Sequence, residues 1–310
     1  MSKISKLSTE CYKGVRDFYP EDMAIQNYIF DTWKKTSEDF GFVEYGASIL
    51  EPAELYREKS GEEIVNEQMF TFVDRGEREV ALRPEMTPTL ARMIAARRKS
   101  LKFPLRWFSI PNLFRYERPQ RGRKREHWQL NCDIMGIAGG EADVEIISLA
   151  HAVMKSFGAK DEDFQICIND RVLLNEKFGS QDLIKLLDRK EKMPAPEFEQ
   201  KWLEISDKEF DPNITPNETI STILKELEER GIKNAVFTPT ITRGFDYYTG
   251  VVFEVFDTHP DNRRALFGGG RYDNLLEIFG VEPVPTVGFG MGDITIRDFL
   301  ETHNLPTSKK

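Results

Sequence analysis

The order of strand-like and helix-like segments is the feature that most constrains the fold of this 310-residue chain. Segments rich in aromatic and β-branched residues read as strands, and they fall into two groups along the sequence. The strand-like segments are 104–116, 128–137, 164–168, 235–242, 248–256 and 285–291. Between the two groups, residues 171–230 place Leu and Lys at helical spacing. One sheet-based domain that carries a helical insertion explains this order better than two independent domains.

Two segments outside the insertion have the spacing of amphipathic helices. In residues 21–40 the apolar side chains recur at helical spacing, and Gly41 suits the helix end. The extended stretch 42–49 follows this helix and ends near Pro52. Residues 141–157 form the second helical pattern. These helices and the predicted strands together indicate a mixed helix-and-sheet domain.

Charge narrows the classes of partner. The chain has 43 Lys and Arg against 52 Asp and Glu, a net charge of −9, and its pI is about 5.2. Such a balance disfavours a protein that coats nucleic acid over its whole surface. It leaves room for one local basic site, because six of the twelve residues in 115–126 are Arg or Lys.

Cysteine and histidine usage argues against a metal or disulfide scaffold. The three cysteines are far apart and form no C-x-x-C pair, and the four histidines are scattered. The histidines are ordinary surface or core residues on this pattern alone. No apolar run approaches the roughly 18 residues of a membrane span, and the N-terminus does not have the pattern of a secretory signal. We therefore expect a cytoplasmic protein with no membrane partner and no protein-ligated metal.

The densest group of chemically capable residues is the stretch 114–126. Arginine binds phosphate and carboxylate through a planar fork and stays charged. A strand–loop–strand carrying several arginines could clamp a triphosphate, and Arg115 leaves an apolar strand, so that it is expected to point into a cleft. The alternative is a solvated charged loop.

Two other segments combine polar groups with apolar surroundings. Glu85 and Thr87 lie two residues apart on one side of an extended segment and could accept hydrogen bonds from an ammonium group. The alternative is that Thr87 caps the helix that follows it. In 242–250, Arg243 beside paired tyrosines could stabilise developing negative charge and hold an aromatic ligand. A core strand with packed tyrosines is the alternative there.

Two glycine-rich segments complete the set. They are 267–273 and 288–292, and glycine lets a backbone approach a ligand closely. Neither matches the dinucleotide-binding or P-loop pattern. Each segment taken alone is more often a turn.

Taken in order, these segments resemble the histidyl-tRNA synthetases, a family of class II aminoacyl-tRNA synthetases. The opening 13–17 also fits, and the helix–strand–Pro52 unit resembles the family's dimer-forming motif 1. Segment 114–133 resembles motif 2, and 288–292 resembles motif 3. Segments 243–250 and 268–273 resemble the two histidine-specific motifs.

The resemblance implies a fold and an activity. The fold is α+β: an antiparallel sheet flanked by helices, with 1–170 and 231–310 as the catalytic domain and 171–230 as a small helical insertion. The activity is that of a histidine–tRNA ligase, which activates histidine with ATP to histidyl-adenylate and transfers it to the tRNA 3′ end in protein biosynthesis. The implied partners are histidine, ATP with Mg²⁺, the acceptor end of tRNA(His) and a second copy of the chain through motif 1.

The resemblance also implies roles for individual residues. Arg115 and Arg243 are the catalytic arginines on either side of the α-phosphate. The histidine-binding residues are Glu85, Thr87, Gln129, Asp133, Tyr247 and Tyr248. The ATP-binding residues are Arg115, Glu117, Arg123, His127, Arg243 and Gly292.

The chain departs from the family's pattern in two places. The adenine-stacking arginine of motif 3 counts to Thr295, and Arg297 stands two residues later, on another face of a helix. His127 falls where motif 2 supplies the ring on the other adenine face. The sequence also stops where family members continue, so we expect the anticodon-binding domain to be absent. These departures leave an alternative open: a non-catalytic paralogue acting as the regulatory subunit of ATP phosphoribosyltransferase in histidine biosynthesis.

Overall fold

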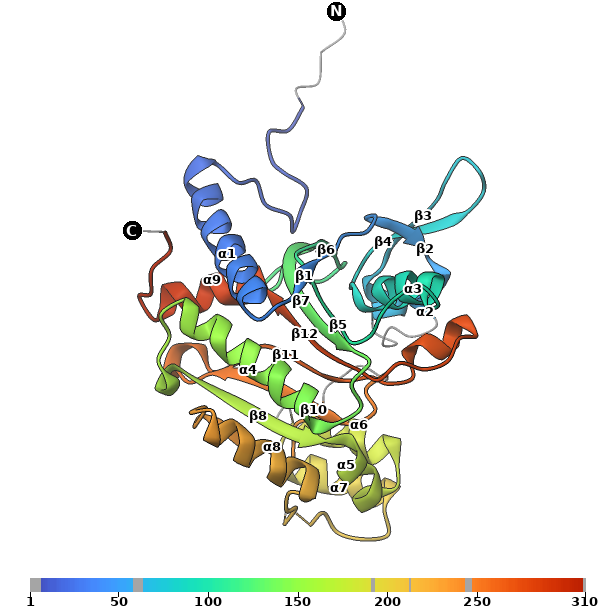
Figure 1. Cartoon of the computed structure of the whole chain (residues 1–310), viewed down its shortest axis with the longest axis vertical. Helices are drawn as coiled ribbons and strands as arrows, with labels where there is room; N and C mark the ends of the chain where they lie inside the picture. The colour runs from blue at the N-terminus through green and yellow to red at the C-terminus, as the bar shows by residue number, and fades with distance from the viewer. Residues whose placement is uncertain (1–6, 58–63, 191–192, 212, 243–246, 309–310) are drawn as a thin grey trace, which may run out of the picture.

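A nine-stranded sheet organises the part of the chain that the structure describes. The structure is a computed structural model, and it describes residues 7–57, 64–190, 193–211, 213–242 and 247–308. The strand order is β1-β5-β7-β12-β11-β10-β8-β9, with β6 paired to β7 (Figure 1). The edge pairs β1–β5 and β8–β9 are parallel, and the pairs between them are antiparallel. The predicted α+β class, with an antiparallel sheet flanked by helices, is confirmed.

The strands of this sheet are short at its edges and long at its centre. Their bounds are β1 Val43–Glu44, β5 Leu105–Ser109, β6 Asn112–Phe114, β7 Glu126–Met135, β8 Phe164–Asp170, β9 Ala235–Phe237, β10 Val251–Asp257, β11 Ala265–Arg271 and β12 Thr286–Gly292. A separate three-stranded sheet has the order β2-β4-β3, with β2 Leu50–Pro52, β3 Phe70–Val73 and β4 Glu79–Leu82.

Helices connect and cover the strands. The α-helices are α1 Pro20–Asp39, α2 Glu54–Arg57, α3 Thr87–Arg97, α4 Gly140–Ser156, α5 Arg171–Phe178, α6 Gln181–Asp188, α7 Ala195–Ile205, α8 Glu218–Glu229 and α9 Asp293–Thr302. Short turns of other helix types are η1 Ile64–Gln68, η2 Asp161–Asp163, η4 Pro260–Asn262 and η5 Leu275–Phe279.

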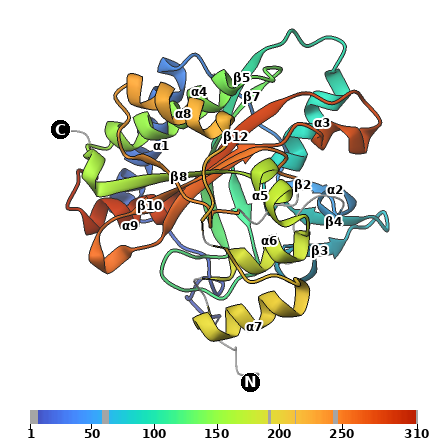
Figure 2. The ribbon, with the colours of Figure 1, turned by 90° about the horizontal axis from the view of Figure 1, so that it is seen from below.

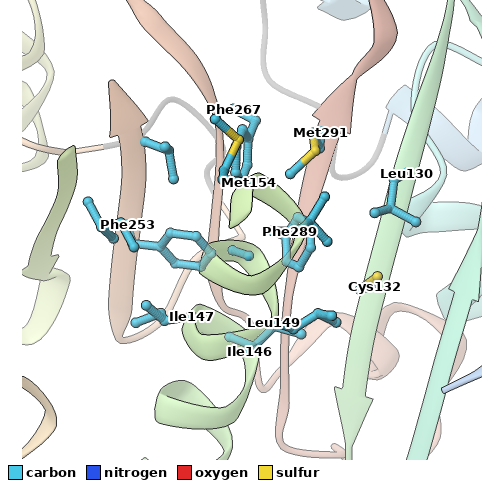
Figure 3. Packing of buried hydrophobic residues seen from close by; sticks show 14 of the residues in the cluster. Leu130, Cys132, Ile146, Ile147, Leu149, Met154, Phe253, Phe267, Phe289 and Met291 are labelled. Atoms are coloured by element: carbon cyan, nitrogen blue, oxygen red, sulfur yellow. The ribbon is translucent and has the colours of Figure 1, made fainter. Parts of the chain in front are cut away.

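The main core lies between one face of the large sheet and helices α1, α4, α8 and α9. Side chains of α4 pack against Phe253, Phe267 and Phe289 from three adjacent strands (Figure 3). Burying each such side chain contributes about 1.5–3 kcal/mol. The helical periods predicted for 21–40 and 141–157 therefore correspond to α1 and α4, whose apolar faces cover this side of the sheet.

The inserted segment divides between two cores. Helices α5, α6 and α7 share a small apolar cluster that includes Leu187, Phe198 and Trp202. Helix α8 instead places Ile220 and Ile223 in the main core beside α4. Figure 2 shows α5–α7 grouped apart from α4 and α8. The domain division at 170 and 231 stays a prediction, and the packing groups α8 with the large sheet.

Several sequence-based boundaries shift in the structure. The glycine-rich segments 267–273 and 288–292, which taken alone favour turns, lie largely within β11 and β12. Glycine is needed there because a Cβ on Gly269 would stand 2.0 Å from the carbonyl oxygen of Gly288. The three-stranded sheet was not predicted, since its strands have only three or four residues each.

A buried ion pair fastens β11 to the start of α4. The Arg271 guanidinium donates to Asp143 at 2.7 Å and to the carbonyl oxygens of Ile137 and Gly139 at 3.1 and 3.0 Å. The Arg271 and Asp143 side chains are 8% and 2% exposed. Removing one partner of such a pair leaves a buried charge without compensation.

We expect Arg271→Ala to lower the free energy of unfolding by about 3–5 kcal/mol. Lys201→Ala is the control, because it removes an exposed pair with Glu197 and should cost less than about 0.5 kcal/mol. Urea unfolding followed by circular dichroism measures both. Equal, small effects would show that Arg271 does not hold the two elements together.

Candidate active site

A pocket of about 320 Å³ opens on the sheet, with walls from β7, β10, β11 and β12. Every predicted site residue within the described part of the chain lines it. They are Glu85, Thr87, Arg115, Glu117, Arg123, His127, Gln129, Asp133, Tyr247, Tyr248 and Gly292. Arg243 lies outside the described residues. Segments that are far apart in the sequence thus meet in one cavity.

The alternation of side chains along β7 decides which residues reach the pocket. Leu130, Cys132 and Ile134 are buried in the main core, whereas Gln129 and Asp133 line the pocket. Each polar residue therefore belongs to the face opposite to the helices.

Glycines on β12 make room for the β7 side chains. Gly288 is paired with Asp133, and a Cβ on Gly288 would stand 2.1 Å from Asp133 Oδ1. A Cβ on Gly290 would stand 2.7 Å from the side chain of Gln129. The glycine spacing in 288–292 follows from this close approach.

One set of pocket residues carries buried carboxyl and phenol groups. Glu85 is 2% exposed, and the Tyr247 hydroxyl donates to its Oε2 at 3.1 Å. Burial, with the charge of Glu85, raises the pKa of Tyr247 well above its usual value, so the phenol remains a donor. Thr87 is the first residue of α3, and the capping position falls on Met86. The alternative that Thr87 caps this helix is therefore wrong.

Asp133 has a partner that the sequence analysis did not identify. The Tyr272 hydroxyl donates to Asp133 Oδ1, and the Tyr272 ring stands 5.5 Å from the Tyr247 ring. Burial raises the pKa of Asp133 to about 7, against the effect of the Tyr272 hydrogen bond. The segment 268–273 was singled out for its glycines, and Tyr272 follows them directly.

A second set of pocket residues is basic. Arg115 Nε donates to the carbonyl oxygen of Pro84 at 2.8 Å, which fixes the guanidinium plane. Arg123 Nη1 lies 3.5 Å from Glu117 Oε2 in the loop 115–125. These guanidinium groups are suited to phosphate oxygens, which accept from guanidinium groups in pairs.

His127 stands beside Arg115 as a neutral ring. Burial lowers the pKa of His127 to about 3, and the charges of Arg115 and Arg16 act in the same direction. A neutral imidazole can stack on a flat aromatic ligand without placing a further cation there.

The start of α9 forms part of the pocket wall. Thr295 lines the pocket, and its hydroxyl donates to the carbonyl oxygen of Leu266 at 2.8 Å. Arg297 points to α1, where it pairs with Asp22 at 3.0 Å. Arg297 is therefore not directed to the place that an adenine-stacking arginine would need.

Three further pocket residues had been given no individual role by the sequence analysis. They are Glu254 on β10, Asn131 on β7 and Lys124 in the loop 115–125. Glu254 is a charged residue in the otherwise apolar stretch of β10, and this contrast is the sequence feature that could have identified it as a site residue. Among the described residues, no group of three or more His, Cys, Asp or Glu is placed to hold a metal ion. None of the helices in the described ranges is both long and apolar enough to cross a membrane.

Comparisons with known proteins agree with the geometry. The model of the family described as histidyl-tRNA synthetase matches residues 14–194 and 200–293. This chain belongs to the histidyl-tRNA synthetase family. A histidine–tRNA ligase of Leptospira biflexa is 44% identical over 334 aligned positions, which cover 98% of this chain and 76% of that protein. One from Thermoplasma volcanium is 37% identical and covers 98% and 78%.

Solved structures support the family's fold. The apo histidyl-tRNA synthetase of S. aureus superposes with a TM-score of 0.72 at 23% identity, over 96% of this chain and 75% of that one. A Bacillus halodurans protein described as an ATP phosphoribosyltransferase regulatory subunit/histidyl-tRNA synthetase reaches 0.79 at 24% identity, over 97% and 84%. Both show the class II catalytic fold.

Burial of Asp133 predicts a pH-dependent effect on stability. The folded-state pKa of Asp133, near 7, lies above the ordinary value of 3.8. The contribution of this carboxyl to the free energy of unfolding is therefore full below pH 4 and is lost as pH rises through 7. Asp133→Asn should therefore stabilise the protein by about 2–4 kcal/mol at pH 8 and change little at pH 4. Thermal unfolding at both pH values measures this.

Asp161→Asn is the matched control for that experiment. Lys155 and His151 hold the pKa of Asp161 below its usual value, so removing its charge should not stabilise the protein at pH 8. Stabilisation by Asp133→Asn that is equal at pH 4 and pH 8 would contradict the assignment.

The neutrality of His127 predicts which substitutions it tolerates. His127→Phe keeps a flat ring without charge and should change KM for ATP by less than about threefold. His127→Ala removes the ring and should raise that KM by about tenfold, the loss of one stacking contact. Steady-state ATP titration measures both, and an equal loss in the two variants would indicate a role for the ring nitrogens instead.

Proposed function

We propose that this chain activates histidine with ATP and transfers the histidyl group to the 3′ end of tRNA(His). The observation that carries the proposal is one pocket lined by two chemically different sets of residues. One set holds the buried carboxyl and phenol groups of Glu85, Asp133, Tyr247 and Tyr272, and the other holds the guanidinium groups of Arg115 and Arg123. An amino acid and a nucleoside triphosphate would each find complementary groups there.

The proposed histidine contacts use the set with carboxyl and phenol groups. Glu85 and Thr87 accept hydrogen bonds from the ammonium group, with Gln129 beside them. Asp133 accepts from one ring N–H of the imidazole, while the tyrosines Tyr247 and Tyr248 pack beside the ring. An amino acid without a ring N–H would leave one oxygen of the buried Asp133 without the partner that the imidazole supplies, which gives strong discrimination without editing.

The proposed chemistry is an in-line displacement followed by acyl transfer. The histidine carboxylate oxygen bonds to the α-phosphorus, the bond from that phosphorus to the bridging oxygen breaks, and pyrophosphate leaves. A terminal ribose hydroxyl of the tRNA then attacks the histidyl carbonyl carbon, loses its proton and releases AMP. Arg115 stabilises the charge that spreads over the α-phosphate. We assign the same role on the opposite side to Arg243.

The nucleotide contacts use the basic loop and the start of α9. Arg123 and Glu117 face ATP, His127 stacks on the adenine, and Gly292 allows close approach of the backbone. The donor set fits Mg²⁺: Glu117 and Glu254 offer hard carboxylate oxygens in the pocket, and few protein ligands suit an ion carried in by phosphates. When bound, Mg²⁺ would neutralise phosphate charge.

The wider assembly is also part of the proposal. We infer a cytoplasmic enzyme that forms a homodimer through motif 1. Exposed apolar side chains support this interface, because Val43, Leu50 and Phe72 are 62%, 46% and 48% exposed on strands of the motif 1 region and the adjoining small sheet. Large exposed apolar side chains are common at protein–protein interfaces.

A regulatory subunit of ATP phosphoribosyltransferase is the second candidate. It is favoured by Thr295 at the motif 3 position and by the similarity to the Bacillus halodurans structure. The enzyme is favoured by the complete Arg115 loop and by curated relatives at 37–44% identity that are histidine–tRNA ligases. A regulator would not need to keep a phosphate clamp.

Histidine-dependent exchange of pyrophosphate into ATP tests the proposal. Wild-type protein should catalyse exchange, and Arg115→Ala or Arg243→Ala should lower the exchange rate by about 10²-fold or more with histidine affinity retained. Arg118→Ala is the control, because this exposed arginine lies on the same loop outside the pocket lining. No exchange by folded, histidine-binding wild-type protein would overturn the enzyme and favour the regulator.

A further inference from the structure

A three-residue ion cluster closes the outer rim of the pocket. Asp298 on α9 accepts from Arg121 Nε at 2.9 Å and contacts the Arg264 guanidinium through its other oxygen. Arg121 belongs to the loop 115–125 between β6 and β7, and Arg264 precedes β11. One carboxylate therefore joins the loop 115–125, helix α9 and the segment that leads into β11.

Each arginine of the cluster makes a further hydrogen bond. Arg264 Nη1 donates to the carbonyl oxygen of Arg121 at 3.1 Å, and Arg121 Nη2 donates to the Thr302 hydroxyl at 3.3 Å. Arg264 lies directly against Gly122, where a Cβ would stand 2.3 Å from Arg264 Nη1. Gly122 has φ of +77°, a conformation that glycine adopts without strain. The loop tip fits against Arg264 only because residue 122 has no side chain.

This cluster stands next to the pocket residues that are proposed to contact the nucleotide. The loop contributes Glu117 and Arg123 to the lining, and Asp298 follows the pocket residue Thr295 by one turn on the same face of α9. Asp298 is 16% exposed and Arg264 26%, so the pair is only partly screened by solvent. The position of the loop relative to the opposite wall is therefore set at Asp298.

We propose that Asp298 is a positioning residue that holds the loop 115–125 closed over the nucleotide. Its negative charge keeps two guanidinium groups side by side that would otherwise repel each other. Without it the loop tip loses its charge-assisted hydrogen bonds to α9, and Glu117 and Arg123 lose their fixed distance from the opposite wall. The inference rests on the proposed function only for the identity of the nucleotide, because the position of the loop can be measured by proteolysis without any activity.

Asp298→Asn tests this assignment in two ways. In the exchange assay KM for ATP should rise about tenfold while KM for histidine stays within twofold, because the loss of charge-assisted bonds affects only the nucleotide contacts. Independently of activity, trypsin should cleave after Arg123 several-fold faster in the variant. Asp298→Glu keeps the charge, so its KM for ATP and its rate of trypsin cleavage should lie closer to the wild-type values.

Glu301→Gln is the matched control. It removes one negative charge from the same helix, where Glu301 pairs with Arg297 at 2.9 Å away from the loop. Neither KM for ATP nor trypsin cleavage should change in this variant. If Asp298→Asn lowers the melting temperature strongly, Arg121→Ala serves instead, because Arg121 is 58% exposed and its loss removes the side-chain contact between the loop and Asp298, while the Arg264 contact remains.

The outcomes separate the two proposals. Unchanged cleavage and unchanged KM for ATP in Asp298→Asn would overturn the positioning role while the exchange activity itself stands. Absence of exchange in the wild type, with faster cleavage in the variant, would overturn the proposed function and keep the closed loop. Equal rises in KM for ATP and histidine would show a general structural role for Asp298 and would also overturn the proposal.

Discussion

The close antiparallel pairing of β7 with β12 is the constraint on which both the core and the pocket depend. Strand β7 sends Leu130, Cys132 and Ile134 into the main core, and the residues between them face the pocket. Strand β12 has glycine at positions 288 and 290, because any Cβ there would collide with the β7 side chains. A shift of one residue in this register would exchange the two faces, so the hydrophobic core fixes the identity of the pocket residues.

The pocket brings acidic and basic side chains into one cavity. Glu85 and Asp133 line it together with Arg115 and Arg123. Burial disfavours the charged form of Asp133 and of His127, so both are shifted toward neutrality in the folded chain. Above pH 7 the buried Asp133 carboxyl must carry a charge, which lowers the stability of the folded chain. Binding and catalytic sites commonly reduce the stability of a protein in this way.

Local patterns predicted the parts of this structure that depend on neighbours in sequence. Helices α1 and α4 have apolar residues at helical spacing, and the long central strands have aromatic and β-branched residues. The ordered motifs predicted most of the pocket lining. Parallel pairing at the sheet edges was not predictable, because β1 has two residues and no pattern of its own. Tyr272 was missed because its contact with Asp133 joins residues 139 apart.

Helix α9 contributes side chains to both the main core and the pocket, so the two depend on each other. At its first residue, Asp293 is fully buried and accepts from Arg16 at 2.7 Å, Gln26 at 3.0 Å and the Trp128 backbone N–H at 2.9 Å. Three donors satisfy a carboxylate that would otherwise be costly to bury.

These contacts fix the start of α9 against the N-terminal segment, α1 and β7 at once. From that fixed start, Ile296 and Phe299 enter the main core, while Thr295 faces the pocket and Asp298 meets the loop at its rim. A rotation of α9 that moved the pocket wall would expose core residues and break the Asp293 contacts together. The part of the pocket wall that α9 forms therefore gains its rigidity from the same burial that stabilises the fold.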